Sequence, residues 1–533
     1  MKLKNLIYSI PLAVIMIAVG TGCRKSQFNI NKNVNDPTDS TVTYDVVLPA
    51  ALHASGGIVS NQWGFLQNWM GCWARSGTYA PNVIEETYQI TTTFGNGIWN
   101  ACYDNNYDYN IVQVKAHTAG AGFFEGIARI MKAHNFAILV DVYGNVPYSQ
   151  ALKGSGNPTP AYDNGVDIYK SLLREIDAGM LLIKNAVVAA TGPNKDIAKN
   201  DIMFGGDKTK WAQFGNTLKL RLLMHAYAVA AIDKTAEFNI INAEGSGYMA
   251  SDATIQPGYA TDKPMPFYGT YKANAAGTRV ANNVYYAANK FGISMYTGDG
   301  DPRAARFYQA GTTGGLTGVP YGLPPVSTYA DGAVANIGPG LYRSATASQM
   351  FFSLAEAYFL RAEARQRGFI TSGASAQSLM ESGTMASFVW MGTANPAAEV
   401  PAYILGNAGY PDVDYNASAA NTGFPGGLVT IISQKYFALN GINTLEIWND
   451  YRRIPFSSIA GAPVGANTTH FTYGLAGGYG AGPTISVSPQ LPPGTQIPIR
   501  LLYPQTEYNY NPANVGGQGA ITPQSPRVFW DIN

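Results

Sequence analysis

The stretch D-V-Y-G-N-V-P-Y-S, residues 141–149, predicts where a long helix ends and how the chain leaves it. The residues before it, 123–140, are predicted to form that helix. Gly144 can adopt the positive φ found at helix ends, and Pro147 prevents the helix from continuing. These residues therefore predict a helix that ends in a tight turn.

Helical periodicity recurs on both sides of this stretch and predicts a mostly α fold. Residues 98–115 and 123–140 are expected to form an antiparallel pair that turns at residues 120–122. A second pair is indicated by apolar residues at steps of three and four. Its two stripes are Val166, Tyr169, Leu173, Ile176, Met180 and Ile183, and Trp211, Phe214, Leu218, Leu222, His225 and Val229. We interpret His225 as a satisfied core histidine and not as a metal ligand.

Further helices and two irregular segments complete the pattern. The helices are predicted at residues 61–74, 345–367, 375–391 and 428–450. Residues 248–342 are dense in Gly, Pro, Thr, Tyr and Asn, and residues 76–97 form a shorter irregular segment. Long loops of this kind in a compact protein are usually functional or disordered. A ligand surface is therefore expected on these segments.

The N-terminus has the pattern of a bacterial lipoprotein signal. Two lysines precede an apolar run at residues 6–19, which is too short to span a bilayer. Small residues follow and lead to Cys23. Residues 1–22 are thus predicted to be removed as a signal peptide, and the thiol of Cys23 is predicted to be acylated. An ordinary signal peptide with an incidental cysteine is the alternative.

The domain organisation follows from these segments. Residues 23–45 are predicted to be a tether, and residues 46–533 a single domain. The helical scaffold of that domain is expected at about 98–230 and 345–452, and the loop-rich excursion at about 248–342. The lipid would hold the domain on a membrane without a transmembrane helix.

Composition limits the partners. The 35 basic and 34 acidic residues give a net charge of +1, which argues against a nucleic-acid partner, because phosphate binding needs a clustered basic patch. Few residues are charged and many carry hydroxyl or amide groups, which suits a neutral, hydroxyl-rich ligand.

Besides Cys23 the chain has Cys72 and Cys102, which are expected to be buried free thiols, with a disulfide as the alternative.

No catalytic or metal-binding motif is present in the sequence. It lacks the HExxH, GxSxG and GxxxxGK[ST] patterns, so no catalytic residue, metal ligand or cofactor is predicted. Two Asp-X-Asp motifs, residues 299–301 and 412–414, do not extend to a calcium loop with a terminal Glu. A pair of carboxylates for glycoside hydrolysis has no fixed spacing, so a glycosidase stays open.

Seven short motifs occur in a fixed order behind the lipoprotein cysteine. They are D-V-Y-G-N-V-P-Y-S at 141–149, W-A-Q-F-G-N-T-L-K-L-R at 211–221, D-P-R at 301–303, S-L-A-E-A-Y-F-L-R-A-E-A at 353–364, Q-K-Y at 434–436, W-N-D-Y-R-R at 448–453 and I-R-L-L-Y-P at 499–504. This set resembles the SusD/RagB family of outer-membrane nutrient-binding lipoproteins over residues 35–530. By their chemistry the motifs suit scaffold roles; Arg452 and Arg453, for instance, can lock a corner.

The resemblance implies both a fold and a function. The fold would be a tetratricopeptide-type stack of helix pairs, with loop-rich excursions that carry the ligand face. The protein would bind an oligomeric nutrient, glycan in the first place, and deliver it to a TonB-dependent outer-membrane barrel of SusC type. It would act by binding and not by bond cleavage. The alternatives are a lipid-anchored glycosidase, a peptide-binding member of the same family, and a structural lid with little ligand affinity.

Six tyrosines in the irregular segments are the predicted ligand-binding residues. They are Tyr79 and Tyr88 in the first segment, and Tyr268, Tyr271, Tyr321 and Tyr329 in the second. Each ring could stack on the C–H face of a sugar, and each hydroxyl could form hydrogen bonds. Packing within its own loop is the alternative for each of them. The hypothesis is that two or three of the six are exposed together on one surface.

Overall fold

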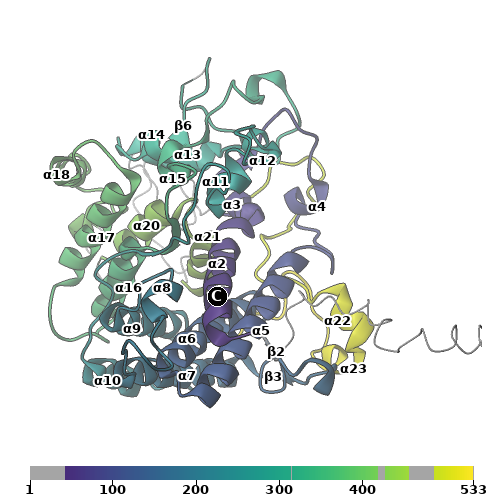
Figure 1. Cartoon of the computed structure of the whole chain (residues 1–533). Coiled ribbons are helices and arrows are strands. Elements are labelled where there is room, and N and C mark those ends of the chain that lie inside the picture. Colours follow the sequence, from purple (N-terminus) through teal and green to yellow (C-terminus); the bar gives the residue numbers. More distant parts are fainter. Residues whose placement is uncertain (1–41, 314, 418–426, 455–484, 532–533) are drawn as a thin grey trace, which may run out of the picture. The chain divides into compact units, whose positions relative to one another are not determined.

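The computed structural model (Figure 1) describes residues 42–313, 315–417, 427–454 and 485–531. The chain divides into a unit that ends at Thr43 and a unit that begins at Tyr44, and the fold described below is that of the second unit. The predicted signal peptide, Cys23 and nearly all of the tether lie outside the described residues. Within those ranges, no helix has the length and apolar character needed to cross a bilayer.

The second unit opens with a helix that the sequence pattern did not reveal. Helix α2 (Tyr44–Asn61) begins inside the predicted tether and contains Pro49. This proline and two central glycines obscure the apolar periodicity, yet the helix buries Leu48 and Leu52 in the core. The side chain of Ser55 joins α2 to helix α5 (Asn96–Ala119) through hydrogen bonds to Asn105 and Tyr109.

The first predicted helix pair is confirmed. Helices α5 (Asn96–Ala119) and α6 (Gly122–Tyr143) are separated by a two-residue turn, in which Gly120 has a φ of 69°. At the other end of α6, Gly144 has a φ of 83°. The chain then enters strand β2 (Val146–Pro147), which pairs with β3 (Tyr162–Asp163). Glycine at both turns fits a backbone region that other residues rarely adopt.

The second predicted pair is also confirmed. Helices α7 (Gly165–Asn185) and α9 (Lys208–His225) carry the two apolar stripes, although Val229 lies beyond the end of α9. Helix α7 also packs on α6 at a crossing of two glycines. A Cβ atom built on Gly126 would lie 2.5 Å from the carbonyl oxygen of Gly179, so only glycine permits this approach.

The C-terminal helices follow the prediction with two corrections. The helix predicted at residues 345–367 begins only at Leu354, because residues 349–352 form strand β8 (Gln349–Phe352). Helices α16 (Leu354–Gln366) and α17 (Ala376–Met391) form a further pair. Residues 428–450, predicted as one helix, form α20 (Leu428–Leu439) and α21 (Thr444–Arg453). The break follows from Gly441, whose φ is 68°. The remaining helices outside the loop-rich segments are α8 (Ile197–Asn200), α10 (Lys234–Glu244), α18 (Pro396–Gly406), α22 (Gln505–Tyr510) and α23 (Pro512–Gly516).

The loop-rich segments contain more regular structure than predicted. Strand β1 (Trp73–Arg75) belongs to a four-stranded sheet of order β1-β5-β7-β6. The helix predicted at residues 61–74 is therefore wrong beyond α3 (Gly64–Trp69). The other strands are β4 (Ala253–Ile255), β5 (Tyr286–Ala288), β6 (Tyr308–Gln309), β7 (Asn336–Ile337) and β8 (Gln349–Phe352), with β4 paired to β8. Short helices connect them: α4 (Val83–Glu86), α11 (Pro266–Tyr271), α12 (Ala281–Tyr285), α13 (Lys290–Gly298), α14 (Ala304–Phe307) and α15 (Pro339–Tyr342).

Candidate functional site: the tyrosine loops and the buried charged core

The structure joins the two irregular segments into one surface, which we call the tyrosine loops (residues 76–88, 279–286 and 321–331). Strands β1 and β5 pair next to it, and the amide of Ser76 donates to the carbonyl of Tyr285 at 2.8 Å. The amide of Gly77 donates to the carbonyl of Tyr329 at 2.7 Å. A Cβ atom on Gly77 would lie 2.5 Å from the carbonyl oxygen of Val326, so the crossing requires glycine.

A buried arginine holds the tyrosine loops in place. Arg75 is 2% exposed, and its Nε donates to Glu86 Oε1 at 2.6 Å. Its Nη1 donates to the carbonyl oxygen of Tyr79 at 2.6 Å, and its Nη2 to that of Leu323 at 2.7 Å. One guanidinium thus fixes two loops that are far apart in the sequence, and Glu86 balances its charge.

Three of the six predicted tyrosines are buried. Tyr88, Tyr271 and Tyr321 are 1%, 3% and 1% exposed. The hydroxyl of Tyr88 accepts from the amide of Ser486, and the ring of Tyr271 lies 5.2 Å from that of Trp73. Because a buried ring offers no face to a ligand, the structure gives these three residues packing roles in place of the predicted ligand contacts.

The other three predicted tyrosines are half-buried and do not all lie together. Tyr79 and Tyr329 lie in adjoining segments of the tyrosine loops, whereas Tyr268 packs against the ring of Tyr342. The ring of Tyr79 also contacts Tyr285, with centroids 5.3 Å apart. Tyr285 was missed, although it too lies in the loop-rich sequence. The ligand role stays a prediction for Tyr79, Tyr268 and Tyr329.

The surface around these rings is partly apolar, and the carboxyl group of Glu85 is buried beneath it. Val83, Ile84 and Val326 are 41%, 46% and 42% exposed on the same loops. Under them, burial raises the pKa of Glu85 to about 7, although a hydrogen bond from Asn68 opposes the shift. Glu85 is buried and its neighbour Glu86 is paired with Arg75, so these two carboxylates do not face a cleft as a hydrolytic pair would.

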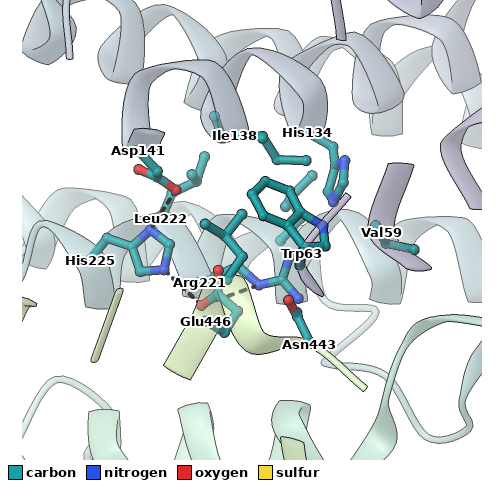
Figure 2. A pocket seen from close by; sticks show the side chains of 13 residues that line it. Val59, Trp63, His134, Ile138, Asp141, Arg221, Leu222, His225, Asn443 and Glu446 are labelled. Carbon is teal, nitrogen blue, oxygen red and sulfur yellow. Dashed lines mark hydrogen bonds and ion pairs between the residues drawn. The ribbon is translucent and has the colours of Figure 1, made fainter. Parts of the chain in front are cut away.

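Figure 2 shows a second polar cluster, which lies in the core and consists of Asp141, His225 and Glu446. These residues come from α6, α9 and α21, and in the described ranges they are the one group of three side chains with metal-ligand spacing. Nδ1 of His225 lies 3.3 Å from Asp141, and Nε2 lies 2.8 Å from Glu446. Burial alone would lower the pKa of His225, but the two carboxylates outweigh it and raise the pKa to about 9.

This geometry is that of a buried ion triad and not of a metal centre. A metal ion binds one nitrogen of an imidazole, whereas here the two carboxylates lie against opposite nitrogens. The adjacent cavity has a volume of about 20 Å³, which is room for one water molecule. The prediction that His225 is a satisfied core histidine is confirmed, and the cluster stabilises the scaffold.

The charged core extends through the two arginines of the W-N-D-Y-R-R motif, Arg452 and Arg453. Nη1 of Arg452 donates to the carbonyl oxygens of Asp141, at 2.7 Å, and Ile499, at 2.9 Å. Arg453 forms two parallel hydrogen bonds to Glu363, both 2.6 Å long. These contacts join four of the seven motifs, which confirms the scaffold role predicted for the two arginines.

The two Asp-X-Asp motifs also meet in the structure. Burial and the charge of Asp301 raise the pKa of Asp299 to about 8, while hydrogen bonds involving Asp412 and Tyr403 act in the opposite direction. Asp301 itself is neutralised by Arg303, with Nη2 and Oδ2 2.6 Å apart. The spacing within each motif gave no indication that the two would lie together.

Comparison with known proteins identifies relatives over nearly the whole domain. Residues 46–472 match a family profile, SusD-like, described as starch-binding and associating with the outer membrane. A solved SusD/RagB family protein from Bacteroides thetaiotaomicron is 20% identical, with a TM-score of 0.69 over 92% of this chain and 99% of that one. No match was found among curated proteins.

Two further solved structures show the same fold. A SusD homologue from Bacteroides fragilis is 22% identical, with a TM-score of 0.65 over 92% of this chain and 99% of that one. A chitin-binding SusD homologue from Flavobacterium johnsoniae is also 22% identical, with a TM-score of 0.65 over 91% of this chain and 99% of that one. At these identities the similarity establishes the helical scaffold.

Proposed function

Because the chain belongs to the SusD-like family of outer-membrane nutrient-binding proteins, which are not enzymes, we propose that it binds an oligosaccharide at its tyrosine loops. The observation that carries this proposal is the joining of two distant segments so that Tyr79, Tyr285 and Tyr329 lie on adjoining loops. Half-buried tyrosines held on a fixed backbone suit the stacking of sugar rings. Chitin binding by a structural relative supports a glycan as the ligand.

Substitution of the tyrosine loops tests the proposal. Tyr79→Ala and Tyr329→Ala are each expected to weaken binding of the cognate oligosaccharide by about 1–3 kcal/mol, with little change in melting temperature. Calorimetry with maltotriose, N,N′-diacetylchitobiose, other glycans and short peptides would measure this. Tyr510→Ala is the matched control, because Tyr510 is 75% exposed and lies on α22. Unchanged affinity in both loop variants would contradict the placement, and binding of peptides alone would favour the peptide alternative.

We also infer that a lipid on Cys23 anchors the protein to the outer membrane. The signal pattern before Cys23 supports this, and two acyl chains would anchor the protein stably where one would not. Cys23→Ala is expected to move the protein from the membrane fraction to the soluble fraction after a high-salt wash. A variant that stays in the membrane fraction would contradict the lipid anchor.

We infer further that the protein delivers its ligand to a SusC-type TonB-dependent barrel. Family membership supports this partner. Purification from a mild detergent extract through a C-terminal tag is expected to bring down a protein of the size of a 22-stranded plugged transporter. Recovery of the chain alone under the same conditions, with a control membrane protein complex still intact, would contradict delivery to such a barrel.

A further inference from the structure

A second pocket lies on the helical scaffold, and we call it the motif pocket because Tyr148 and Ser149 of the D-V-Y-G-N-V-P-Y-S motif line it. Helices α5, α6 and α7 form its other walls, in the lower half of Figure 1, whereas α12 of the tyrosine loops lies in the upper part. Its volume is about 270 Å³. A water molecule occupies about 30 Å³ in the liquid, so the pocket has room for a small ligand such as one sugar ring.

Two polar groups in the motif pocket lack the partners that buried groups normally have. Oε1 of Gln113 is buried and has no hydrogen-bond partner in the described part of the chain. The ammonium group of Lys132 has one hydrogen bond, to Asn110 Oδ1 at 3.2 Å, and no ion pair with any described carboxylate. Burial lowers the pKa of Lys132 to about 8. Burying a polar group without a hydrogen bond destabilises the folded protein, unless a ligand or a water molecule supplies the missing hydrogen bond.

The charges around Lys132 narrow the class of ligand. Glu175 of α7 faces the pocket, but its carboxylate is bound by Arg129 at 2.8 Å, and Arg129 also binds Glu125 of its own helix. An anion would accept from Lys132 but could not donate to the oxygen of Gln113. A cation would donate to Gln113 but would be repelled by Lys132. A neutral hydroxyl group does both, since it accepts from an ammonium and donates to a carbonyl oxygen.

Aromatic side chains complete the motif pocket. The rings of Phe136 and Tyr148 meet edge to face with centroids 4.8 Å apart, and both line the pocket. The ring of Tyr148 is half-buried and can meet the C–H groups of a sugar, whereas Phe136 is buried and packs against the ring of Tyr148.

The loop that closes the motif pocket is fixed in place. The carboxylate of Asp163 accepts hydrogen bonds from the amides of Tyr148 and Ser149, both at 2.9 Å, and from the hydroxyl of Ser149 at 2.7 Å. Further along the loop, Leu152 has a φ of 62°, a conformation that a leucine rarely adopts. The lining is thus held ready before any ligand arrives.

We propose that the motif pocket is a second carbohydrate subsite, which holds one neutral sugar ring between Lys132, Gln113 and the ring of Tyr148. The inference rests on the proposed function for its ligand class, but it places binding on the helical scaffold and not on the tyrosine loops. With one site on the helical scaffold and one on the tyrosine loops, the protein could bind a long glycan at two points. Binding at both points would raise the affinity above that of either site alone.

Lysine footprinting of the full chain tests the proposal without changing the pocket. The protein is acetylated at pH 8 with and without maltotriose or N,N′-diacetylchitobiose, and each lysine is quantified by peptide mass spectrometry. At a sugar concentration about ten times the dissociation constant, acetylation of Lys132 is expected to slow about tenfold. The rate at Lys170, an exposed lysine of α7, should not change.

Variants and an anion control separate the alternatives. Gln113→Leu keeps the side-chain volume but removes the carbonyl oxygen. The sugar concentration that half-protects Lys132 is therefore expected to rise about fivefold, since a hydrogen bond is worth about 1 kcal/mol. Tyr79→Ala should leave the protection intact even where it abolishes binding at the tyrosine loops. No protection by any sugar, protection by sodium phosphate alone, or loss of protection in Tyr79→Ala would each overturn the second subsite.

Discussion

Asp141→Ala is expected to lower the free energy of unfolding by about 3–5 kcal/mol, because it leaves buried donors and a buried imidazolium without their acceptor. Asp141 accepts from the hydroxyl of Tyr169 and from the indole Nε1 of Trp530 at 2.9 Å. It also lies 3.3 Å from Nδ1 of His225. Urea unfolding of the purified soluble domain would measure the loss from the midpoint and slope. The control is Asp167→Ala, at an exposed position of α7.

The pH dependence of stability provides an independent check on this variant. In the folded protein the pKa of His225 is raised to about 9 from a usual value of 6.5. The contribution of His225 is therefore fully present below pH 6.5 and is lost as the pH rises through 9. In Asp141→Ala one of the two carboxylates is gone, so this loss between pH 6.5 and 9 should become smaller. An unfolding free energy within about 1 kcal/mol of wild type would contradict the role given to Asp141.

Arg453→Met is expected to cost a similar amount, about 3–5 kcal/mol, because it removes the shared partner of two buried carboxylates. Arg453 binds Glu363 through two hydrogen bonds of 2.6 Å and donates from Nε to Asp450 at 2.8 Å. Burial opposes ionisation of Glu363, but the charges of Arg453 and Arg367 outweigh it and hold the pKa of Glu363 well below its usual range. The variant therefore leaves Glu363 buried without the arginine that most stabilises its charged form.

A double variant distinguishes the loss of the ion pair from a general loss of packing. Arg453→Met combined with Glu363→Leu removes both charges, so it should be more stable than Arg453→Met alone. Arg174→Met is the control for the loss of an arginine, since Arg174 is half exposed on α7. If the double variant is no more stable than the single one, the buried charge is not the cause of the loss. Urea unfolding would again supply the free energies.

The sequence predicted those parts of the fold that depend on local patterns. The helix pairs α5–α6 and α7–α9 follow from periodicity and from the glycines at their ends. Helix α2 was missed because Pro49 and glycines interrupt its pattern, while packing against α5 still holds it. Strand β1 was predicted as helix because its pairing with β5 is more than 200 residues distant in sequence. Such pairing leaves no local signal.

The candidate sites show the same limit. Tyr79 and Tyr88 have equivalent surroundings in the sequence, yet only Tyr88 is buried, because residues near position 486 fold over it. In the sequence, only Tyr148 and Ser149 of the motif pocket belong to a recognisable motif. Gln113 and Lys132 lie on two different helices, so no local pattern indicates that they meet. His225 was interpreted correctly, because its place on an apolar helix stripe is a local feature.

The hydrogen bonds that Asp141 accepts have a consequence for how the chain folds. Asp141 and Trp530 are 389 positions apart, and Asp141 lies 308 positions from Asn449, which also donates to it. Contacts of such sequence separation give a high contact order, and proteins rich in them fold slowly. During synthesis α6 emerges long before Asn449 and Trp530, so until then Asp141 can meet only Tyr169 and His225 among these partners. We expect the nascent chain to remain loosely structured until α21 and Trp530 arrive, which would keep it competent for export through a narrow translocation channel.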